Sequence, residues 1–219
     1  MLTSSSSNPG QIEPLPDHYQ PGFSHEKEVI MSHADLIQQK IRIPVRLFNL
    51  ILIGSASLLI AVSAQLAIHL PFSPVPITAQ TAAVMLTGAL LGKKRGMGAV
   101  GLYLVEGLVG FPVFAGGRAG FAVLLGPTGG YLLGFAAAAY LVGALIERGW
   151  DRTLPSSGLA LALGHAVIYA CGLLWLAPLV GYRQALPLGL TPFLIGDALK
   201  ILAASFLLAG SGFLKPGTL

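Results

Sequence analysis

Long apolar segments alternate with short polar or proline-rich breaks along most of this chain. The first segment, residues 47–70, has no charged residue in 24 positions. A helix rises about 1.5 Å per residue, so this segment is long enough to cross a hydrocarbon core roughly 30 Å thick. Further apolar segments follow at residues 77–92, 96–111, about 128–146, 158–180 and about 190–213. The pattern predicts an all-α integral membrane protein with six transmembrane helices.

The breaks between these segments have distinct compositions. Pro71, Pro74 and Pro76 forbid continuation of the first helix, because proline lacks an N–H and disfavours helical geometry in the residue before it. Residues 112–130 are apolar but rich in glycine and proline. Irregular backbone at membrane depth persists only where protein or water satisfies its polar groups. We therefore expect a Gly-rich loop, folded back over the bundle between the third and fourth helices.

Basic residues orient the predicted bundle, since cytoplasmic loops carry the excess of lysine and arginine. On a six-helix topology one side holds Lys40, Arg42, Arg46, Lys93, Lys94, Arg95, Arg148, Arg152 and Lys215. Only Arg118 and Arg183 fall on the other side. The distribution predicts cytoplasmic N- and C-termini and an external Gly-rich loop.

Composition separates a polar tail, residues 1–43, from a membrane domain at residues 44–215. The tail is too polar to bury a core of its own, and we expect it to be a disordered cytoplasmic segment. In the whole chain 54% of residues are hydrophobic and 10% are charged, against about 25% charged in a typical soluble domain. The net charge of +4 lies next to apolar segments and therefore indicates topology rather than nucleic-acid binding. We expect the chain to lie in the cell membrane.

Two ionisable residues, Asp197 and Lys200, interrupt the sixth apolar segment. A spacing of three places both on one helix face. An ionisable residue in a spanning helix is costly and usually faces the bundle interior or a wet cavity. The pair is therefore a candidate ligand site, and the alternative is a structural ion pair between helices. The same two side chains are able to do both.

Other candidates lie toward the same end of the predicted bundle. Arg118, in the external loop, suits a ligand carboxylate, although an alternative is a structural pair with Glu106. Thr128 and Tyr131 lie at the start of the fourth helix and are candidates to line a cavity. Gln80, just after the proline-rich break, is a candidate for a neutral hydrogen bond, as is Thr78.

Catalysis finds little support in the sequence. His165 and Tyr169 share a helix face with Cys171 nearby, but no nucleophile elbow, HExxH motif or paired intramembrane aspartates accompany them. We expect His165 to be a hydrogen-bonded core residue whose replacement by alanine leaves ligand binding near normal. An intramembrane hydrolase would instead lose its activity in that variant. The sequence predicts no cofactor and no metal site.

Four motifs together carry a family resemblance. They are SPVPITAQT (73–81), GFPVFAGG (110–117), GPTGGYLLGF (126–135) and GDALK (196–200). In this order, on a six-helix plan, they resemble the biotin-specific substrate-binding (S) components of energy-coupling factor (ECF) transporters, the BioY family. The resemblance covers roughly residues 47–213, and the N-terminal tail lies outside it.

The resemblance implies that biotin binds from the outside, beneath the loops after the first and third helices. It also implies that Asp197 and Lys200 contact the ligand. Biotin's ureido ring has two N–H donors and a carbonyl acceptor, which a carboxylate and an ammonium can satisfy together. The biotin carboxylate would then meet Arg118 or solvent, and Gly116 and Gly117 offer only backbone groups. An S component for another vitamin, thiamin or riboflavin, is the nearest alternative.

The resemblance further implies partners, namely a transmembrane coupling protein and two ATPase subunits. Ser57 and Ala61 give the first helix a small-residue face that suits close contact with a partner helix. Small residues serve packing within the bundle equally well, and that alternative stays open.

Overall fold

The computed structural model describes residues 44–212, so the predicted tail and residues 213–215 of the predicted membrane domain lie outside the described residues. The described chain is mostly helical, as predicted. Its helices are α2 (Val45–Gln65), α3 (Gln80–Leu91), α4 (Lys93–Val109), α5 (Phe121–Leu125), α6 (Gly129–Glu147), α7 (Leu154–Val180), α8 (Tyr182–Gly189) and α9 (Leu194–Gly212). Two short strands, β1 (Ala67–Ile68) and β2 (Ile77–Thr78), lie between α2 and α3.

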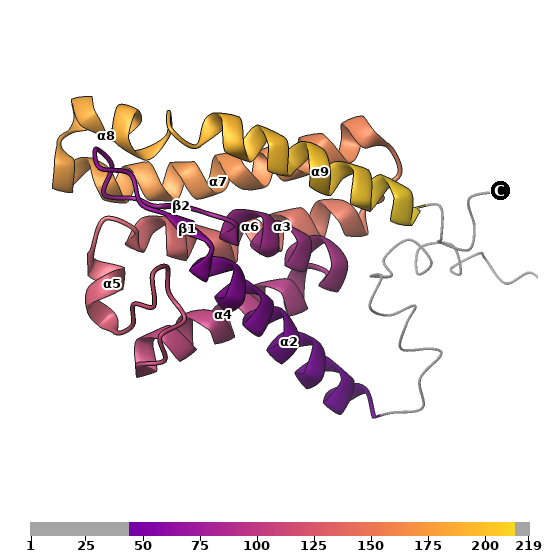
Figure 1. Ribbon diagram of the computed structural model, residues 1–219. Coiled ribbons are helices and arrows are strands. Elements are labelled where there is room, and N and C mark those ends of the chain that lie inside the picture. Colours follow the sequence, from indigo (N-terminus) through magenta and orange to yellow (C-terminus); the bar gives the residue numbers. More distant parts are fainter. Residues whose placement is uncertain (1–43, 213–219) are drawn as a thin grey trace, which may run out of the picture.

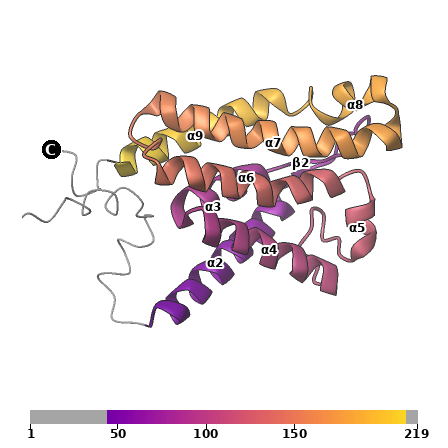
Figure 2. The same ribbon diagram turned by 180° about the vertical axis from the view of Figure 1, so that it is seen from behind.

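Helix α6 lies at the centre of the bundle. It packs against α7 on one side and against α3 and α4 on the other, while α9 packs along α7. Figure 2 shows α6 between α7 and α4, and Figure 1 shows α2 crossing the α4 side diagonally. Most buried positions of these helices are apolar, as expected of a bundle whose outer faces are also apolar.

The segments that connect the helices lie at the two ends of the bundle. Residues 66–79, 110–128 and 181–193, together with β1, β2, α5 and α8, gather at one end, which we call the loop end (Figure 1). The opposite end contains the α3–α4 and α6–α7 turns, and we call it the basic end. There Lys93 Nζ lies 3.2 Å from Glu147 Oε2, and the Lys93 N–H donates to Glu147 Oε1 at 3.0 Å. This ion pair ties the α3–α4 turn to the end of α6.

Three described helices, α2, α6 and α7, are long and apolar enough to cross a membrane. The bent pair of α8 and α9, with an angle of 47° between them, makes a fourth if it counts as one span. Helix α3 has 12 residues and α4 has 17. The helical membrane fold is thus confirmed at this coarser level, and six crossings remain a prediction.

Several predicted helix boundaries differ from the structure, and two of the differences have a clear local reason. The first helix ends at Gln65 rather than at residue 70, because Ala67 and Ile68 pair antiparallel with Thr78 and Ile77. The last helix begins at Leu194, after the separate helix α8. Pro192 lies in the break between them, where it disfavours helical geometry in the residue before it.

Close packing of α3 on α6 depends on a glycine. A Cβ added at Gly88 would lie 2.4 Å from the backbone oxygen of Ala139, well inside van der Waals contact. A Cβ at Gly101, in α4, would meet nothing within 4 Å. The first position therefore fixes how closely the two helices approach, and the second does not.

We predict that Gly88→Ala destabilises the protein by about 1–3 kcal/mol, the usual cost of overpacking a core. The matched control Gly101→Ala makes the same chemical change in open space, and should leave stability equal or slightly higher because alanine favours helix. Thermal unfolding of the two variants in detergent measures the difference. Equal melting temperatures would show that α3 and α6 are not held together through Gly88.

Candidate functional site

A cavity lies between the segments of the loop end and the helices beneath them. Its walls come from the segment before β2, from β2 and α3, from residues 114–128, and from α6, α7 and α9. The lining residues are Val75, Pro76, Thr78, Gln80, Thr81, Phe114, Ala115, Arg118, Val123, Thr128, Tyr131, Leu132, Phe135, Ile168, Tyr169, Phe193, Asp197 and Lys200. Most of these are apolar, and the charged ones are Arg118, Asp197 and Lys200. Six of the eight predicted ligand-binding residues therefore lie on one cavity.

The pair of Asp197 and Lys200 forms as the spacing predicts. Lys200 Nζ lies 2.8 Å from Asp197 Oδ1, and it also donates to the backbone oxygen of Thr78 at 2.6 Å and to Thr81 Oγ1 at 3.1 Å. Asp197 is 6% exposed and sits in the first turn of α9, where the helix dipole favours a negative charge. The pair thus joins α9 to β2 and α3 while it faces the cavity.

Helix α7 holds the other oxygen of the same carboxylate. The Tyr169 hydroxyl donates to Asp197 Oδ2, and His165 Nε2 lies 3.8 Å from that oxygen. His165 Nδ1 lies 3.0 Å from the Leu161 carbonyl, and the side chain is 4% exposed. His165 is therefore a buried core residue, as predicted, but it is a neighbour of Asp197. The effect of His165→Ala on ligand binding stays a prediction.

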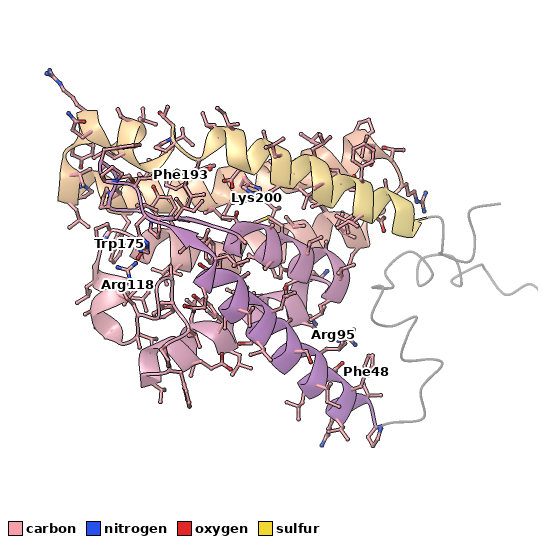
Figure 3. All side chains as sticks on the ribbon, in the orientation of Figure 1. Phe48, Arg95, Arg118, Trp175, Phe193 and Lys200 are labelled. Atoms are coloured by element: carbon pink, nitrogen blue, oxygen red, sulfur yellow. The ribbon has the colours of Figure 1, made fainter. Side chains whose placement is uncertain are left out.

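Arg118 lies away from the Asp197–Lys200 pair, nearer the loops (Figure 3). Its side chain is exposed, and Nε donates to the Ala115 backbone oxygen at 3.1 Å. Glu106 accepts a hydrogen bond from Ser57 Oγ at 2.7 Å, and within the described chain it forms no ion pair with Arg118. The predicted structural pair is thus wrong, because the small polar residue on α2 takes the carboxylate. The guanidinium keeps N–H groups for a ligand.

Phe114 anchors the loop that carries Arg118. Its ring is 1% exposed and meets Tyr103 edge-on at 5.5 Å between centroids. The ring fills the space above Gly107, where an added Cβ would lie 2.1 Å from the Phe114 ring. Gln80 lines the cavity beside them and donates to the Tyr103 hydroxyl at 2.5 Å. One N–H of the Gln80 side-chain amide, which the sequence predicted to contact the ligand, is therefore already bonded within the protein.

Gln65, for which the sequence predicted no role, holds the same loop from α2. Its Oε1 accepts the Gly117 N–H at 3.0 Å. Its Nε2 lies within 3.5 Å of three consecutive carbonyl oxygens, those of Pro112, Val113 and Phe114. Nε2 also lies 3.2 Å from the Ala61 oxygen of α2, so its two N–H groups are shared among four carbonyls. This one exposed side chain thus bonds both an N–H and carbonyl oxygens of an irregular segment. A polar residue at the end of an apolar helix was the only signal in the sequence.

Gly116 and Gly117 shape the loop and, among the described residues, do not line the cavity. Their φ angles of +72° and +69° lie in the left-handed region that favours glycine. The Gly117 N–H is already donated to Gln65, and it also lies 3.0 Å from the Phe114 oxygen. The turn itself therefore uses the Gly117 donor, and ligand contacts from the backbone of these two residues stay a prediction.

Tyr131 and Thr128 both line the cavity from α6 and its start. The Tyr131 hydroxyl donates to the Gly189 backbone oxygen at 2.8 Å, and its ring lies where a Cβ at Gly172 would be. Tyr131 therefore offers the cavity its ring, while its hydroxyl holds α8. Thr128 makes no side-chain cap bond at the start of α6, so its hydroxyl is not committed to that helix.

Ser57 and Ala61 are buried on the side of α2 that packs in the bundle. Ser57 is fully buried and bonded to Glu106, and Ala61 belongs to the apolar core. Of the two interpretations that the sequence left open, packing within the bundle is the one that this arrangement supports. The buried pair presents no open face to a partner.

The charged and apolar side chains that line the cavity indicate which kind of ligand it could bind. An acid–base pair with neighbouring hydroxyls lies in one part, a guanidinium lies toward the loops, and apolar side chains line the space between. Pockets of this kind bind a largely apolar small molecule and orient it through a few polar contacts. Within residues 44–212, no group of three or more His, Cys, Asp or Glu side chains is placed to hold a metal ion.

Comparison with known proteins identifies relatives of this chain. The model of the BioY family matches residues 35–213. The probable biotin transporter BioY of Pyrococcus horikoshii is 40% identical over 67% of this chain and 85% of its own length. The biotin transporter BioY2 of Lactococcus lactis subsp. cremoris is 40% identical over 75% of this chain and 90% of its own. The biotin transporter BioY of Thermotoga maritima is 40% identical over 73% and 92% respectively.

A solved structure agrees with these relatives. The crystal structure of the S-component for biotin from an ECF-type ABC transporter superposes with a TM-score of 0.70 at 27% sequence identity. The match covers 78% of this chain and 93% of that one. The two chains thus share their fold over nearly the whole length of the solved protein.

We predict that Gln65→Ala loosens residues 112–118, because each lost hydrogen bond contributes roughly 1 kcal/mol. Hydrogen–deuterium exchange should become about tenfold faster or more in peptides from this loop, and stay unchanged in peptides from the middle of α6. Gln65→Glu keeps an acceptor for the Gly117 N–H but loses the donors. Its loop should therefore exchange faster than in the wild type and more slowly than in Gln65→Ala. Unaltered loop exchange in Gln65→Ala would show that Phe114 alone holds the segment.

Proposed function

Because this chain belongs to the BioY family, we propose that it binds biotin in the cavity at its loop end and delivers it for uptake as the S component of an ECF-type transporter. Family membership and the apolar helices identify it as a multi-pass protein of the plasma membrane. The observation that carries the proposal is the ion pair of the part-buried Lys200 with the buried Asp197 on a mostly apolar cavity.

The chemistry of biotin fits this arrangement. Its ureido ring has two N–H donors and one carbonyl, which suit the polar cluster around Asp197. Its thiophane ring and valeryl chain are apolar and suit the walls formed by residues such as Phe114, Phe135 and Phe193. Its carboxylate suits the Arg118 guanidinium, a fork of N–H donors that matches a planar anion.

The proposal includes an orientation in the membrane. Helices α2, α3, α4, α6, α7 and α9 would be the six crossings, with the loop end outside and both termini in the cytoplasm. Lys93, Lys94, Arg95, Arg148 and Arg152 at the basic end support this orientation, because lysine and arginine collect on the cytoplasmic side. In that orientation the cavity meets its ligand from outside the cell.

The proposal also includes a transmembrane coupling protein and two ATPase subunits as the partners of this S component. Membership of the BioY family, whose relatives described above are named as biotin transporters, supports a role in transport over that of an intramembrane hydrolase. The relatives described above are named for biotin, which favours biotin over thiamin or riboflavin. Equilibrium binding to the purified protein tests the ligand, and a biotin Kd weaker than micromolar would contradict the proposal.

We predict that Asp197→Ala and Lys200→Ala each weaken biotin binding more than tenfold, about 1.4 kcal/mol or more. Each change removes a ligand contact and leaves its buried partner uncompensated. The matched control is Lys93→Ala, which breaks the ion pair at the basic end and should leave the Kd unchanged. Isothermal titration of folded protein measures all three. Unchanged affinity in both site variants would make the pair purely structural.

Arg118→Ala should weaken biotin binding about tenfold, because the ligand carboxylate loses its cation. Biotin amide, which has no charged carboxylate, should bind the wild type and this variant about equally. Arg183→Ala, an exposed arginine of α8 at the same end, is the control for a general change in charge. A loss of equal size for biotin and biotin amide would place the carboxylate elsewhere.

A further inference from the structure

All three N–H groups of Lys200 have partners inside the protein. An ammonium has three donors and no acceptor. Lys200 Nζ lies 2.6 Å from the Thr78 oxygen, 2.8 Å from Asp197 Oδ1 and 3.1 Å from Thr81 Oγ1. A ligand acceptor therefore reaches this ammonium only by replacing one of the three. A ligand donor meets no such obstacle, because the acidic side of the cluster still has free lone pairs.

The two oxygens of the Asp197 carboxylate accept different numbers of hydrogen bonds. Asp197 Oδ1 already accepts from Lys200 and from the Thr81 hydroxyl, the latter at 3.3 Å. Oδ2 accepts from the Tyr169 hydroxyl. His165 Nε2, at 3.8 Å, lies beyond hydrogen-bond distance of Oδ2 and has no partner in the described chain. Tyr169 is thus the donor that satisfies this oxygen, and the carboxylate itself is only 6% exposed.

Tyr169 has an oxygen to offer the ligand. Its single proton is given to Asp197, and no donor among the described residues bonds its oxygen. The side chain is only partly buried, and it lines the cavity. A hydroxyl that donates to a carboxylate is polarised by it, and its oxygen becomes a stronger acceptor. The Tyr169 oxygen therefore presents the cavity with an acceptor that the negative charge of Asp197 strengthens.

We propose that Tyr169 determines specificity at the polar end of the site: its hydroxyl oxygen accepts a ring N–H of the ligand while its proton stays on Asp197. The proposal rests on the proposed function, since it assigns one contact of the biotin ureido ring. The ring carbonyl would then compete with Thr81 for Lys200, because that hydrogen bond is the longest of the three.

Tyr169→Phe tests the contact, because it removes the hydroxyl and keeps the ring. Biotin binding should weaken about tenfold or more. Two analogues, each methylated at one of the two ureido nitrogens, locate the effect. For the analogue that lacks the contacted N–H, wild type and variant should agree within about threefold. Tyr140→Phe, an exposed tyrosine of α6, is the matched control and should bind every ligand as the wild type does.

A double-mutant cycle adds a measurement that a loss of packing would not move. Asp197→Asn weakens the acceptor of the Tyr169 proton, so the losses in Tyr169→Phe and Asp197→Asn should be strongly non-additive. Unfolding temperatures without ligand show whether each variant is folded. If Tyr169→Phe itself fails to fold, the single variant Asp197→Asn still decides the matter, since its loss should shrink for the same methylated analogue.

The outcomes separate the two claims. Biotin binding by the wild type with an unchanged Kd in Tyr169→Phe overturns the inference and leaves the proposed function intact. Equal losses for biotin and both methylated analogues overturn it too, because the tyrosine is then structural. No biotin binding by the wild type refutes the proposed function, and the inference with it.

Discussion

The ion pair of Asp197 and Lys200 is the interaction on which the site depends. Charges inside an apolar bundle are tolerated only when they are paired and their remaining hydrogen-bonding groups are satisfied. Here the Thr78 carbonyl, the Thr81 hydroxyl and the Tyr169 hydroxyl supply those bonds. They come from β2, α3 and α7, so the charges on α9 hold four elements together. The features that make the pair tolerable also shape the cavity.

The loop above the cavity meets the same requirement with neutral groups. Its backbone is irregular, and polar backbone groups at membrane depth need partners from the protein. Gln65 satisfies several of them, while Phe114 fills the space that Gly107 leaves open. These contacts hold a segment rich in glycine against the bundle, with Arg118 on the cavity wall.

Local features of this protein were predictable from sequence, and long-range pairings were not. The spacing of Asp197 and Lys200 predicted their contact because both lie on one helix, and apolar length predicted the helices themselves. Which helix faces α9 depends on packing between distant segments, so His165 was recognised only as a core residue. Glu106 was matched with Arg118, the next charged residue along the chain, whereas its partner on α2 is 49 residues away. Hydrophobic pattern likewise gave no sign of the pairing of β1 with β2, which shortens the first helix.

The rim of the cavity is held unequally on its two sides. Ser73 Oγ donates to the Leu188 oxygen at 2.7 Å, and Tyr131 donates to the neighbouring Gly189 oxygen. The proline-rich segment, α8 and α6 are thereby hydrogen-bonded to one another. The opposite side, residues 110–120, is bound by the Gln65 side chain, by the Phe114 ring against Tyr103, and by the Gly120 N–H, which donates to the Gly107 oxygen of α4 at 2.7 Å. The two sides of the rim are therefore attached to different helices: the proline-rich segment and α8 are bound to α6, and residues 110–120 are bound to α2 and α4.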